Sequence, residues 1–489
     1  MNILFATSEL FPLIKTGGLS DVSYALPKAL EQQGINVSIV LPFYSAIDTT
    51  KWLIERRVEF TLNSQLLEIH QTTLPHTSIP VYLVKCDELY DREGGPYGTS
   101  LADYPDNHKR FYMFCRAVEY ILNTPNLLKK SFDIVHCNDW QTGLIPLFLK
   151  YDNSPIKSLF TIHNMAYGGI FSKEQLKDID LPDDVFHHDK IEFYGSFSFL
   201  KAGLVFADQL TTVSPCYANE IQNPENGCGF DGVLKTRAEN LVGILNGIDT
   251  DEWNPECDTS IAANFSADDP AGKIKNKLFL QDLLKLPINK DVPVISLVGR
   301  LVEQKGIDFV IDAIPVLVEM GCQLIVLGQG QPEYETNLLA LAQHYPNNCW
   351  VKIDYNETLA HQIEAGSDIF LMPSIFEPCG LNQLYSLAYG TLPVVTAVGG
   401  LKDTVKAFTG NNLDEATGFV MASPSSIDLI ETLGFVVETF RNESTWKQLQ
   451  KNAMEQDFSW QISAREYRDR YENLLKTSPE TALNNTLTM

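Results

Sequence analysis

The chain has 489 residues, of which 44% are hydrophobic and 20% are charged. The length fits two domains, or three smaller ones. The proportions are typical of a folded globular protein and exclude a disordered or fibrous class. The formal net charge of −25 argues against a nucleic-acid partner, because the phosphate backbone would be repelled. Any anionic ligand must therefore meet a local concentration of lysine and arginine.

The sequence predicts neither export nor a membrane anchor. No basic residue precedes the apolar run at residues 3–6, and charged residues interrupt the segment after it. No stretch approaches the roughly 18 apolar residues that a bilayer crossing requires. The nine cysteines are odd in number and never spaced as Cys-x-x-Cys, which argues against disulfides and a zinc site. We therefore expect a cytoplasmic protein.

Short β-branched runs alternate with longer amphipathic stretches along the whole chain. In the first half the predicted strands are 3–6, 37–41, 134–136, 159–162 and 210–213. In the second half they are 294–298, 324–327, 351–353, 369–372 and 394–397. This alternation predicts parallel β–α units, so we expect an α/β protein in which each half forms a doubly wound sheet.

Turn residues cluster between the two halves, and the first cluster is at residues 246–249. We place the boundary there, with an N-terminal domain at 1–245 and a C-terminal domain at 246–458. Residues 459–476 carry aromatic and aliphatic side chains at near-helical spacing and are expected to form a helix that packs back on the other domain. Residues 477–489 are expected to be a loose tail.

The pattern Gly-Gly-Leu-x-Asp occurs once in each half, at residues 17–21 and 399–403. Paired glycines ahead of a helix let several backbone N–H groups converge on phosphate oxygens. Lys15 precedes the first copy, and Asp21 is expected to open a helix that ends at Gly34. Two such sites suggest a ligand held between two lobes, although ordinary glycine turns and a solvated lysine also fit the pattern.

Two further clusters in the second half come directly after predicted strands. Arg300 and Lys305 would lie together at one strand end, where they could neutralise a departing diphosphate or form ion pairs at a helix start. Glu377 comes after another strand and could bond sugar hydroxyls, stabilise positive charge at an anomeric carbon, or cap the next helix. The amides near Gly380 and Leu381 could meet phosphate.

Polar residues also end two neighbouring strands of the first half. Parallel pairing would bring Asp139 and His163 to one rim, where each could bind sugar hydroxyls, although a histidine at a strand end is often structural. Trp140 and Tyr97 offer flat faces for a sugar ring, and packing is the alternative for both.

Several other patterns do not indicate a cofactor or a nucleophile. The letters Gly-x-Gly-x-x-Gly at 227–232 come after no predicted strand, and residues 327–330 stop at two glycines, so neither is a dinucleotide fingerprint. His187-His188-Asp189 (187–189) has no second ligand pair at suitable spacing, so we predict no metal. Cys379 has no adjoining histidine, so we do not expect it to act as a nucleophile.

Taken together, the motifs resemble those of bacterial glycogen synthases, a family that includes plant starch synthases. The resemblance runs from residue 2 to about residue 475. It rests on Lys15-Thr16-Gly17-Gly18-Leu19, on Gly299-Arg300 with Lys305-Gly306, and on Phe376-Glu377-Pro378-Cys379-Gly380-Leu381. Phe199-Leu200-Lys201-Ala202-Gly203, Val213-Ser214-Pro215 and Leu245-Asn246-Gly247-Ile248-Asp249 extend it.

The resemblance implies the GT-B fold, in which two Rossmann-like domains face each other across a cleft. It implies that glucose moves from ADP-glucose to the nonreducing end of an α-1,4-glucan, with retained anomeric configuration, release of ADP and no metal. The two partners are then ADP-glucose and the glucan.

The resemblance also assigns roles by matching motif. Lys15, Gly18, Arg300 and Lys305 would hold the donor diphosphate, and Glu377, His163 and Asn164 the transferred glucose, with Glu377, Lys305, Arg300 and His163 as the catalytic set. Asn246, Tyr355, Cys379, Gly380, Leu381, Gly399 and Gly400 would complete the donor site, with Tyr355 stacked on the adenine. Asp139, Tyr97, Trp140 and Asp21 would line the sugar and acceptor side.

Two positions depart from the family pattern, because Gln141 stands where a histidine is usual and Val398 where a threonine is usual. Val398 removes a hydroxyl near the expected phosphate, which leaves donor affinity and nucleotide choice open. The competing classes are a glycoside hydrolase, which needs no phosphate site, a noncatalytic glucan-binding protein, and a dehydrogenase, which needs an intact fingerprint.

Overall fold

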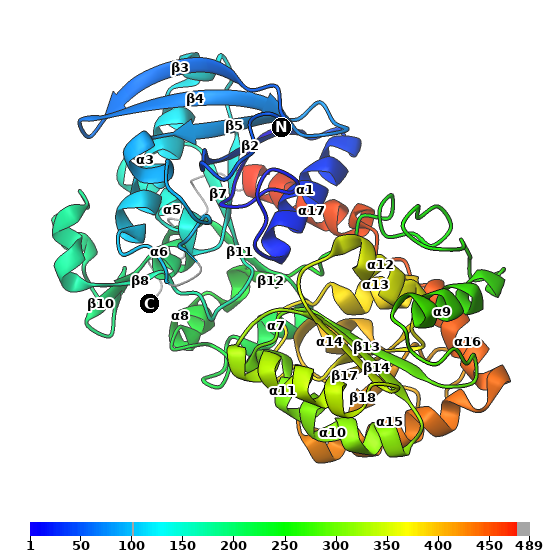
Figure 1. Ribbon diagram of the computed structural model, residues 1–489. Coiled ribbons are helices and arrows are strands. Elements are labelled where there is room, and N and C mark those ends of the chain that lie inside the picture. Colours follow the sequence, from blue (N-terminus) through cyan, green and yellow to red (C-terminus); the bar gives the residue numbers. More distant parts are fainter. Residues whose placement is uncertain (100–101, 477–489) are drawn as a thin grey trace. The chain divides into compact units, whose positions relative to one another are not determined.

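The computed structural model describes residues 1–99 and 102–476, so the loose tail expected at 477–489 lies outside the described residues. The chain divides into two compact units (Figure 1). Unit 1 comprises Met1–Asn246 together with the segment that starts at Trp460, and unit 2 comprises Gly247–Ser459. In the described part of the chain, no helix has the length and apolar character that a membrane crossing needs.

Unit 1 is built on a nine-stranded sheet in the order β12-β11-β7-β6-β1-β2-β5-β4-β3. Its strands are β1 (Asn2–Ala6), β2 (Asn36–Pro42), β3 (Glu55–Leu62), β4 (Gln65–Thr73), β5 (Pro80–Lys85), β6 (Ile134–Asn138), β7 (Lys157–Ile162), β11 (Gln209–Thr212) and β12 (Leu241–Gly243). All strands predicted in this half are present. Neighbouring strands pair in parallel along the part of this sheet that contains β12, β11, β7, β6, β1, β2 and β5, as the alternation of strands and helices predicts.

The sequence analysis missed the hairpin of β3 and β4, which lies antiparallel along the edge of this sheet beside β5 (Figure 1). Strand β3 reads Glu-Arg-Arg-Val-Glu-Phe-Thr-Leu, and no residue in it is fully buried. Charged residues on an edge strand prevent pairing with other chains, and they also hide the strand from a search for apolar runs. A separate small sheet, also missed, contains β8 (Ile170–Ser172), β9 (Glu192–Phe193) and β10 (Ser196–Ser198).

The first predicted helix begins earlier than expected. Helix α1 (Gly18–Gln32) starts three residues before Asp21, which therefore lies in the first turn instead of opening the helix. Its buried face carries Val22, Ala25 and Leu26, and Gly34 lies just beyond its end with φ of 81°.

The other helices of unit 1 connect the strands. They are α2 (Asp87–Tyr90), α3 (Asn107–Asn123), α4 (Pro125–Leu128), η1 (Trp140–Thr142), α5 (Leu144–Tyr151), η2 (Lys173–Asp178), η3 (Asp183–Val185), α6 (Phe199–Phe206), α7 (Pro215–Glu220), α8 (Asp231–Thr236), η4 (Ala238–Asn240) and the C-terminal α17 (Trp460–Lys476). Helix α17 packs on unit 1, where the Tyr471 hydroxyl and His136 Nδ1 are 2.7 Å apart and both side chains are buried.

Unit 2 has a six-stranded parallel sheet in the order β15-β14-β13-β16-β17-β18. The strands are β13 (Val294–Val298), β14 (Gln323–Gly328), β15 (Cys349–Ile353), β16 (Ile369–Met372), β17 (Leu392–Thr396) and β18 (Phe419–Met421). The helices are α9 (Ala271–Leu283), η5 (Glu303–Lys305), α10 (Ile307–Glu319), α11 (Pro332–His344), α12 (Glu357–Gly366), α13 (Asn382–Ala388), α14 (Gly399–Thr404), α15 (Ser426–Phe440) and α16 (Glu443–Met454). Among the strands of unit 2, β18 was the one not predicted.

Candidate active site

The predicted site residues lie beyond the carboxyl ends of parallel strands in both units, which is where ligands bind in open α/β sheets. In unit 1 the loop with Lys15 comes after β1, Asp139 after β6 and His163 after β7. In unit 2 the corresponding positions carry Arg300 after β13, Tyr355 after β15, Glu377 after β16 and Gly399 after β17.

The loop after β1 is organised by Glu9, a residue that the sequence analysis did not select. Its carboxylate accepts hydrogen bonds from Thr16 N at 2.6 Å, from Thr16 Oγ1 at 2.6 Å, from Gly17 N at 3.1 Å and from the Tyr97 hydroxyl at 2.6 Å. Glu9 is only 3% exposed. A buried carboxylate that accepts this many hydrogen bonds fixes the backbone around it.

These hydrogen bonds reduce the number of backbone N–H groups at the first glycine pair that can meet a phosphate. The amides of Thr16 and Gly17 already bond to Glu9, so Gly18 at the start of α1 is left as the glycine whose amide can face a ligand. Lys15 Nζ lies 2.7 Å from Asp21 Oδ1. The lysine is thus held beside the N-terminus of α1, where an anion would be favoured.

Asp139 and His163 lie together, as the predicted strand pairing requires. The Asp139 carboxylate accepts a hydrogen bond from His163 N at 2.7 Å, and His163 Nε2 donates to Asn138 Oδ1 at 2.9 Å. Asn138 in turn donates to Ala6 O at 3.0 Å. Asp139 has φ of 56°, a conformation that non-glycine residues rarely adopt. The surroundings therefore hold this carboxylate in a strained backbone position.

Burial controls the charge of both side chains. It raises the pKa of Asp139 to about 7, against hydrogen bonds from the amides of His163 and Asn164 that lower this pKa. Burial also lowers the pKa of His163 to about 3. The imidazole is therefore neutral at neutral pH and can exchange hydrogen bonds with a sugar hydroxyl without adding a positive charge.

The two aromatic residues expected on the sugar side have structural contacts. Trp140 packs against Phe111 at 4.9 Å and Phe171 at 5.8 Å between ring centroids. Tyr97 bonds to Glu9 and to Ser8, and burial raises its pKa well above the usual value. Both rings therefore have structural contacts within the protein, which agrees with the packing role that the sequence left open for them.

Lys305 and Glu377 form an ion pair across the ends of neighbouring strands in unit 2. Ser374 Oγ donates to the same Glu377 oxygen at 3.1 Å, and Gln304 Nε2 donates to Phe376 O at 3.0 Å. Glu377 is 6% exposed, whereas the Lys305 side chain is 22% exposed. The carboxylate is thus fixed from several sides, while the ammonium also reaches solvent.

The second glycine pair packs against the loop that carries Glu377. A Cβ on Gly399, which has φ of 42°, would lie 1.9 Å from Glu377 O, and one on Gly400 would lie 2.1 Å from Cys379 O. The Gly400 amide points at the carbonyls of Glu377 and Pro378, at 3.2 and 3.3 Å. The two glycines therefore allow α14 and this loop to approach each other closely.

The remaining predicted residues differ in exposure. Arg300 is exposed, and Tyr355 is 59% exposed. Cys379 is buried, and Gly380 has φ of 74° in the turn before Leu381, which precedes α13. Asn246 is buried, and its Oδ1 has no hydrogen-bond partner among the described residues. Asn164 Oδ1 accepts from Ala166 N at 3.0 Å.

Comparison with known proteins places the two halves in separate families. Residues 2–236 match the starch synthase catalytic domain family, and residues 281–456 match glycosyl transferases group 1. The glycogen synthase of Cellvibrio japonicus is 52% identical over 477 residues, which cover 97% of this chain and 99% of that protein. The chain belongs to the glycogen synthase family. The glycogen synthase of Marinobacter nauticus is 45% identical, over 97% of this chain and 98% of its own.

Solved structures place this glycogen synthase in the GT-B fold class. The catalytic domain of starch synthase IV from Arabidopsis thaliana, bound to ADP and acarbose, aligns with a TM-score of 0.88 and 30% identity, over 97% of this chain and 99% of that chain. Sucrose-phosphate synthase from Thermosynechococcus elongatus aligns with a TM-score of 0.60 and 16% identity, over 98% of this chain and 100% of that chain, and so shares the fold. The protein is a glycosyltransferase, and the fold and family expected from the motifs are confirmed.

Proposed function

We propose that Glu377 and Lys305 form the centre at which this glycogen synthase transfers glucose from ADP-glucose to an α-1,4-glucan. The ion pair between them is the observation that carries the proposal. A fixed carboxylate beside a partly exposed ammonium suits a reaction in which positive charge develops on the sugar while negative charge develops on the departing diphosphate.

The difficult step is the separation of these charges. Glu377 bonds hydroxyls of the transferred glucose and stabilises the oxocarbenium-like carbon, while Lys305 and Arg300 stabilise the diphosphate as it leaves. Because Lys305 has three donors on a flexible stem, it can keep Glu377 and still meet a phosphate oxygen. Retention results from attack on the face that the diphosphate leaves, with a departing phosphate oxygen accepting the proton of the acceptor hydroxyl.

Unit 1 supplies the other contacts in this proposal. Lys15 and Gly18 bind the diphosphate, His163 and Asn164 bind the glucose, and Asp139 lies on the sugar and acceptor side. The neutral imidazole of His163, held through Asn138, supports this role, because a sugar hydroxyl needs an oriented hydrogen-bond partner and no charge.

The rest of the proposed site follows the motif assignments. In this proposal Asn246, Tyr355, Cys379, Gly380, Leu381, Gly399 and Gly400 complete the donor site, and Tyr97, Trp140 and Asp21 line the acceptor side. Residues 1–245 form the acceptor domain and residues 246–458 the donor domain. The ring of Tyr355 is exposed and offers a flat face for stacking on adenine, and the solved relative bound to ADP and acarbose supports a nucleotide donor and a glucan acceptor.

We also propose that the enzyme works in the cytoplasm. All nine cysteines are free thiols, and six of them are buried. Protein thiols stay reduced in that compartment.

The donor base is tested by incubating the purified protein with glycogen and radiolabelled ADP-glucose or UDP-glucose. We expect label to enter the polymer mainly from ADP-glucose. Incorporation mainly from UDP-glucose would reject the ADP assignment. Release of labelled glucose without incorporation from either donor would identify a hydrolase, and binding of glycogen without turnover would identify a binding protein.

The catalytic assignment is tested with Glu377→Ala and Lys305→Ala. Each removes charge stabilisation at the reacting centre, so we expect turnover to fall at least ~100-fold in each variant. Lys447→Ala is the matched control, because it removes an exposed ion pair with Glu443 on α16 and is expected to leave turnover unchanged. Near-normal turnover in both site variants, with far-ultraviolet circular dichroism like that of the parent, would reject these roles.

A further inference from the structure

Two groups of side chains in the described chain bring three potential metal-ligating atoms within 4.8 Å of one another. One is the exposed group His187, His188 and Asp189, which the sequence analysis considered and rejected. The other comprises Glu252, Glu357 and His361 in unit 2, in which Glu252 is distant in sequence from the other two, and it was not considered. The second group is partly buried, with His361 only 4% exposed.

The second group is built from two segments of the fold. Glu357 is the first residue of α12 and His361 lies four residues later, so both side chains lie on the same face of that helix. Glu252 comes from the turn after Gly247 at the start of unit 2. A cation held by all three would therefore connect this turn to the first turn of α12.

The histidine is already oriented as a metal ligand. Its Nδ1 is 2.8 Å from Asp258 Oδ2, and the Tyr389 hydroxyl donates to the same oxygen at 2.6 Å. Since the carboxylate accepts the Nδ1–H, the lone pair is left on Nε2, for which the described residues provide no hydrogen bond. A histidine that donates its second ring N–H to a carboxylate is the usual arrangement behind a metal-bound imidazole.

The ring is also fixed by stacking. Trp253 lies between His361 and Tyr385, with centroid distances of 3.8 Å on both sides and interplanar angles of 13° and 11°.

We propose that Glu252, Glu357 and His361 bind one first-row divalent transition cation, such as Mn²⁺ or Zn²⁺. Two carboxylates and one neutral imidazole supply two negative charges to a dication, and mixed oxygen and nitrogen donors favour these ions over Mg²⁺. Ligand atoms around a cation at 2.0–2.2 Å lie about 3 to 4 Å apart, so small rotations of the glutamates complete the site. The proposal is independent of the transferase chemistry, and its test requires no turnover.

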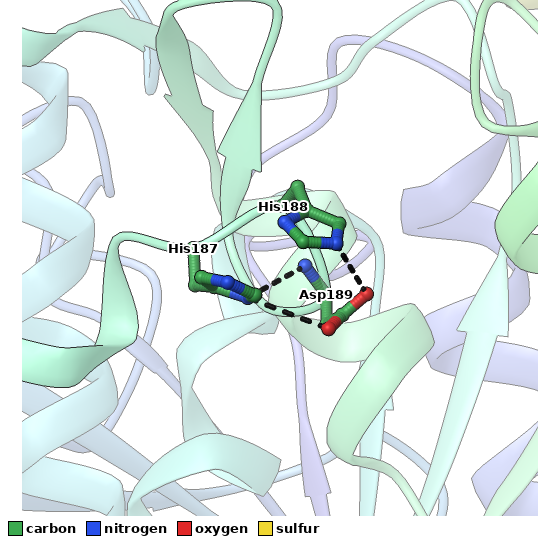
Figure 2. A group of neighbouring side chains, drawn as sticks. All are labelled: His187, His188 and Asp189. Atoms are coloured by element: carbon green, nitrogen blue, oxygen red, sulfur yellow. Dashed lines mark hydrogen bonds and ion pairs between the residues drawn. The ribbon is translucent and has the colours of Figure 1, made fainter.

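The exposed group is a second potential cation site, because its three ligand atoms also face one another. Its histidines must therefore be substituted before the partly buried group is tested. His188 Nε2 lies 3.1 Å from Asp189 Oδ1, and His187 Nδ1 lies 3.4 Å from Asp189 Oδ2. Figure 2 shows both rings turned toward the Asp189 carboxylate. These three residues are adjacent in sequence and exposed, and among the described residues none outside the group holds either ring in a ligating orientation. We therefore use the full-length chain with His187→Asn and His188→Asn as the parent protein for the test.

Mn²⁺ is the probe, because its free ion gives an electron paramagnetic resonance signal that decreases on binding and because thiols compete for it weakly. The parent is expected to bind one Mn²⁺ per chain, and tenfold excess Mg²⁺ is expected to leave it bound. Glu357→Gln is expected to weaken binding at least about 10-fold, since it removes one of three ligands. Glu333→Gln is the matched control, because Glu333 lies exposed in the first turn of α11, the helix that precedes α12 in the chain.

The structure gives no hydrogen bond or ion pair between the Glu357 side chain and other described residues, so the variant should fold like the parent. Equal thermal midpoints without metal check this, and Glu252→Gln provides a second ligand variant. Mn²⁺ is also expected to raise the midpoint of the parent and not that of Glu357→Gln. Equal affinity in the parent and both ligand variants, no binding at about 1 mM Mn²⁺, or full displacement by Mg²⁺ would overturn the proposal.

Discussion

At the scale of single residues, the site depends on buried carboxylates whose partners are far away in sequence. Glu9 receives hydrogen bonds from residues 7, 8 and 88 positions away. Spacing along the chain predicted a donor-site role for Lys15 and Gly18, because they belong to a local motif. It could not identify Glu9, because the role of this residue exists only after Tyr97 and the loop after β1 have come together.

Glu9→Gln is expected to loosen that loop. The amide is uncharged and has one acceptor oxygen where the carboxylate has two, so the charge-assisted hydrogen bonds to this side chain weaken and the free energy of unfolding falls by about 1–3 kcal/mol. We expect KM for ADP-glucose to rise at least about 5-fold with a smaller change in kcat, because Lys15 and Gly18 are placed by this loop. Steady-state kinetics and urea unfolding measure both effects.

Tyr97→Phe is the control for this variant. It removes only one of the four donors and keeps the ring, so its effects on KM and stability should be smaller than those of Glu9→Gln. An unchanged KM in Glu9→Gln would show that the loop keeps its shape without the carboxylate.

Asp139 gives the second prediction at this scale. Its folded pKa of about 7 is above its usual value of 3.8, so the folded state binds the proton more tightly than the unfolded state. Its contribution to stability is therefore full below about pH 4 and is lost as pH rises to about 7. At 1.36 kcal/mol per pKa unit the loss is about 4 kcal/mol at most.

Asp139→Asn has no proton to lose at this position. We expect the stability of the parent, minus that of the variant, to decrease between pH 5 and pH 7.5 in urea unfolding experiments. His163 contributes with the opposite sign, since its lowered pKa of about 3 stabilises the fold above about pH 6.5. It is present in both proteins, so its contribution cancels in the difference. Parallel pH profiles would contradict the raised pKa of Asp139.

At the scale of elements, the β-branched runs predicted strands that are all present, but they did not identify every apolar strand. A strand buried on both faces needs mostly apolar side chains, which is why such runs predict strands. Strands β5, β12 and β18 are also apolar and were not predicted. The charged β3 has no such requirement at the edge of the sheet. The starts of helices were less predictable, since α1 begins at Gly18 and not at Asp21.

The two glycine pairs show how identical motifs can have different packing. A Cβ on Gly17 would meet nothing within 4 Å, whereas a Cβ on Gly399 would lie 1.9 Å from Glu377 O. The sequence analysis gave both pairs the same phosphate-binding role. The structure adds that the second pair also sets the position of the loop that carries Glu377.

Gly399→Ala is therefore expected to displace that loop. The clash and the positive φ of 42° should lower the free energy of unfolding by about 1–3 kcal/mol and turnover at least about 10-fold. Gly17→Ala is the matched control in the first copy and should change stability by less than about 0.5 kcal/mol. Equal effects of the two substitutions would contradict this difference in packing.

At the scale of the whole molecule, the chain passes between the two units twice, at Asn246–Gly247 and at Ser459–Trp460. Helix α17 is thus separated by more than 200 residues from the rest of unit 1, yet it supplies the buried Tyr471 contact to His136 and a hydrogen bond from Ser463 to Leu245 O. Near-helical spacing predicted the helix, while the domain functions assigned to residues 1–245 and 246–458 remain predictions.

A chain that ends at Ser459 is expected to keep unit 2 folded and to destabilise unit 1. Removal of α17 exposes the apolar surface that it covers and leaves the buried His136 without its Tyr471 partner. Scanning calorimetry should show one transition at lower temperature and another close to that of the full chain. A chain that ends at Lys476 is the control, and identical thermograms for both truncations would contradict the structural role of α17.

The double passage also determines when each unit can be completed during synthesis. The ribosome delivers all of unit 2 before the last helix of unit 1, so the part of the protein translated first is completed last. Until Trp460 and the residues after it have left the exit tunnel, the surface on α1 and β7 that receives α17 stays uncovered. A newly made chain therefore exposes this surface to chaperones for the time that a ribosome needs to translate unit 2.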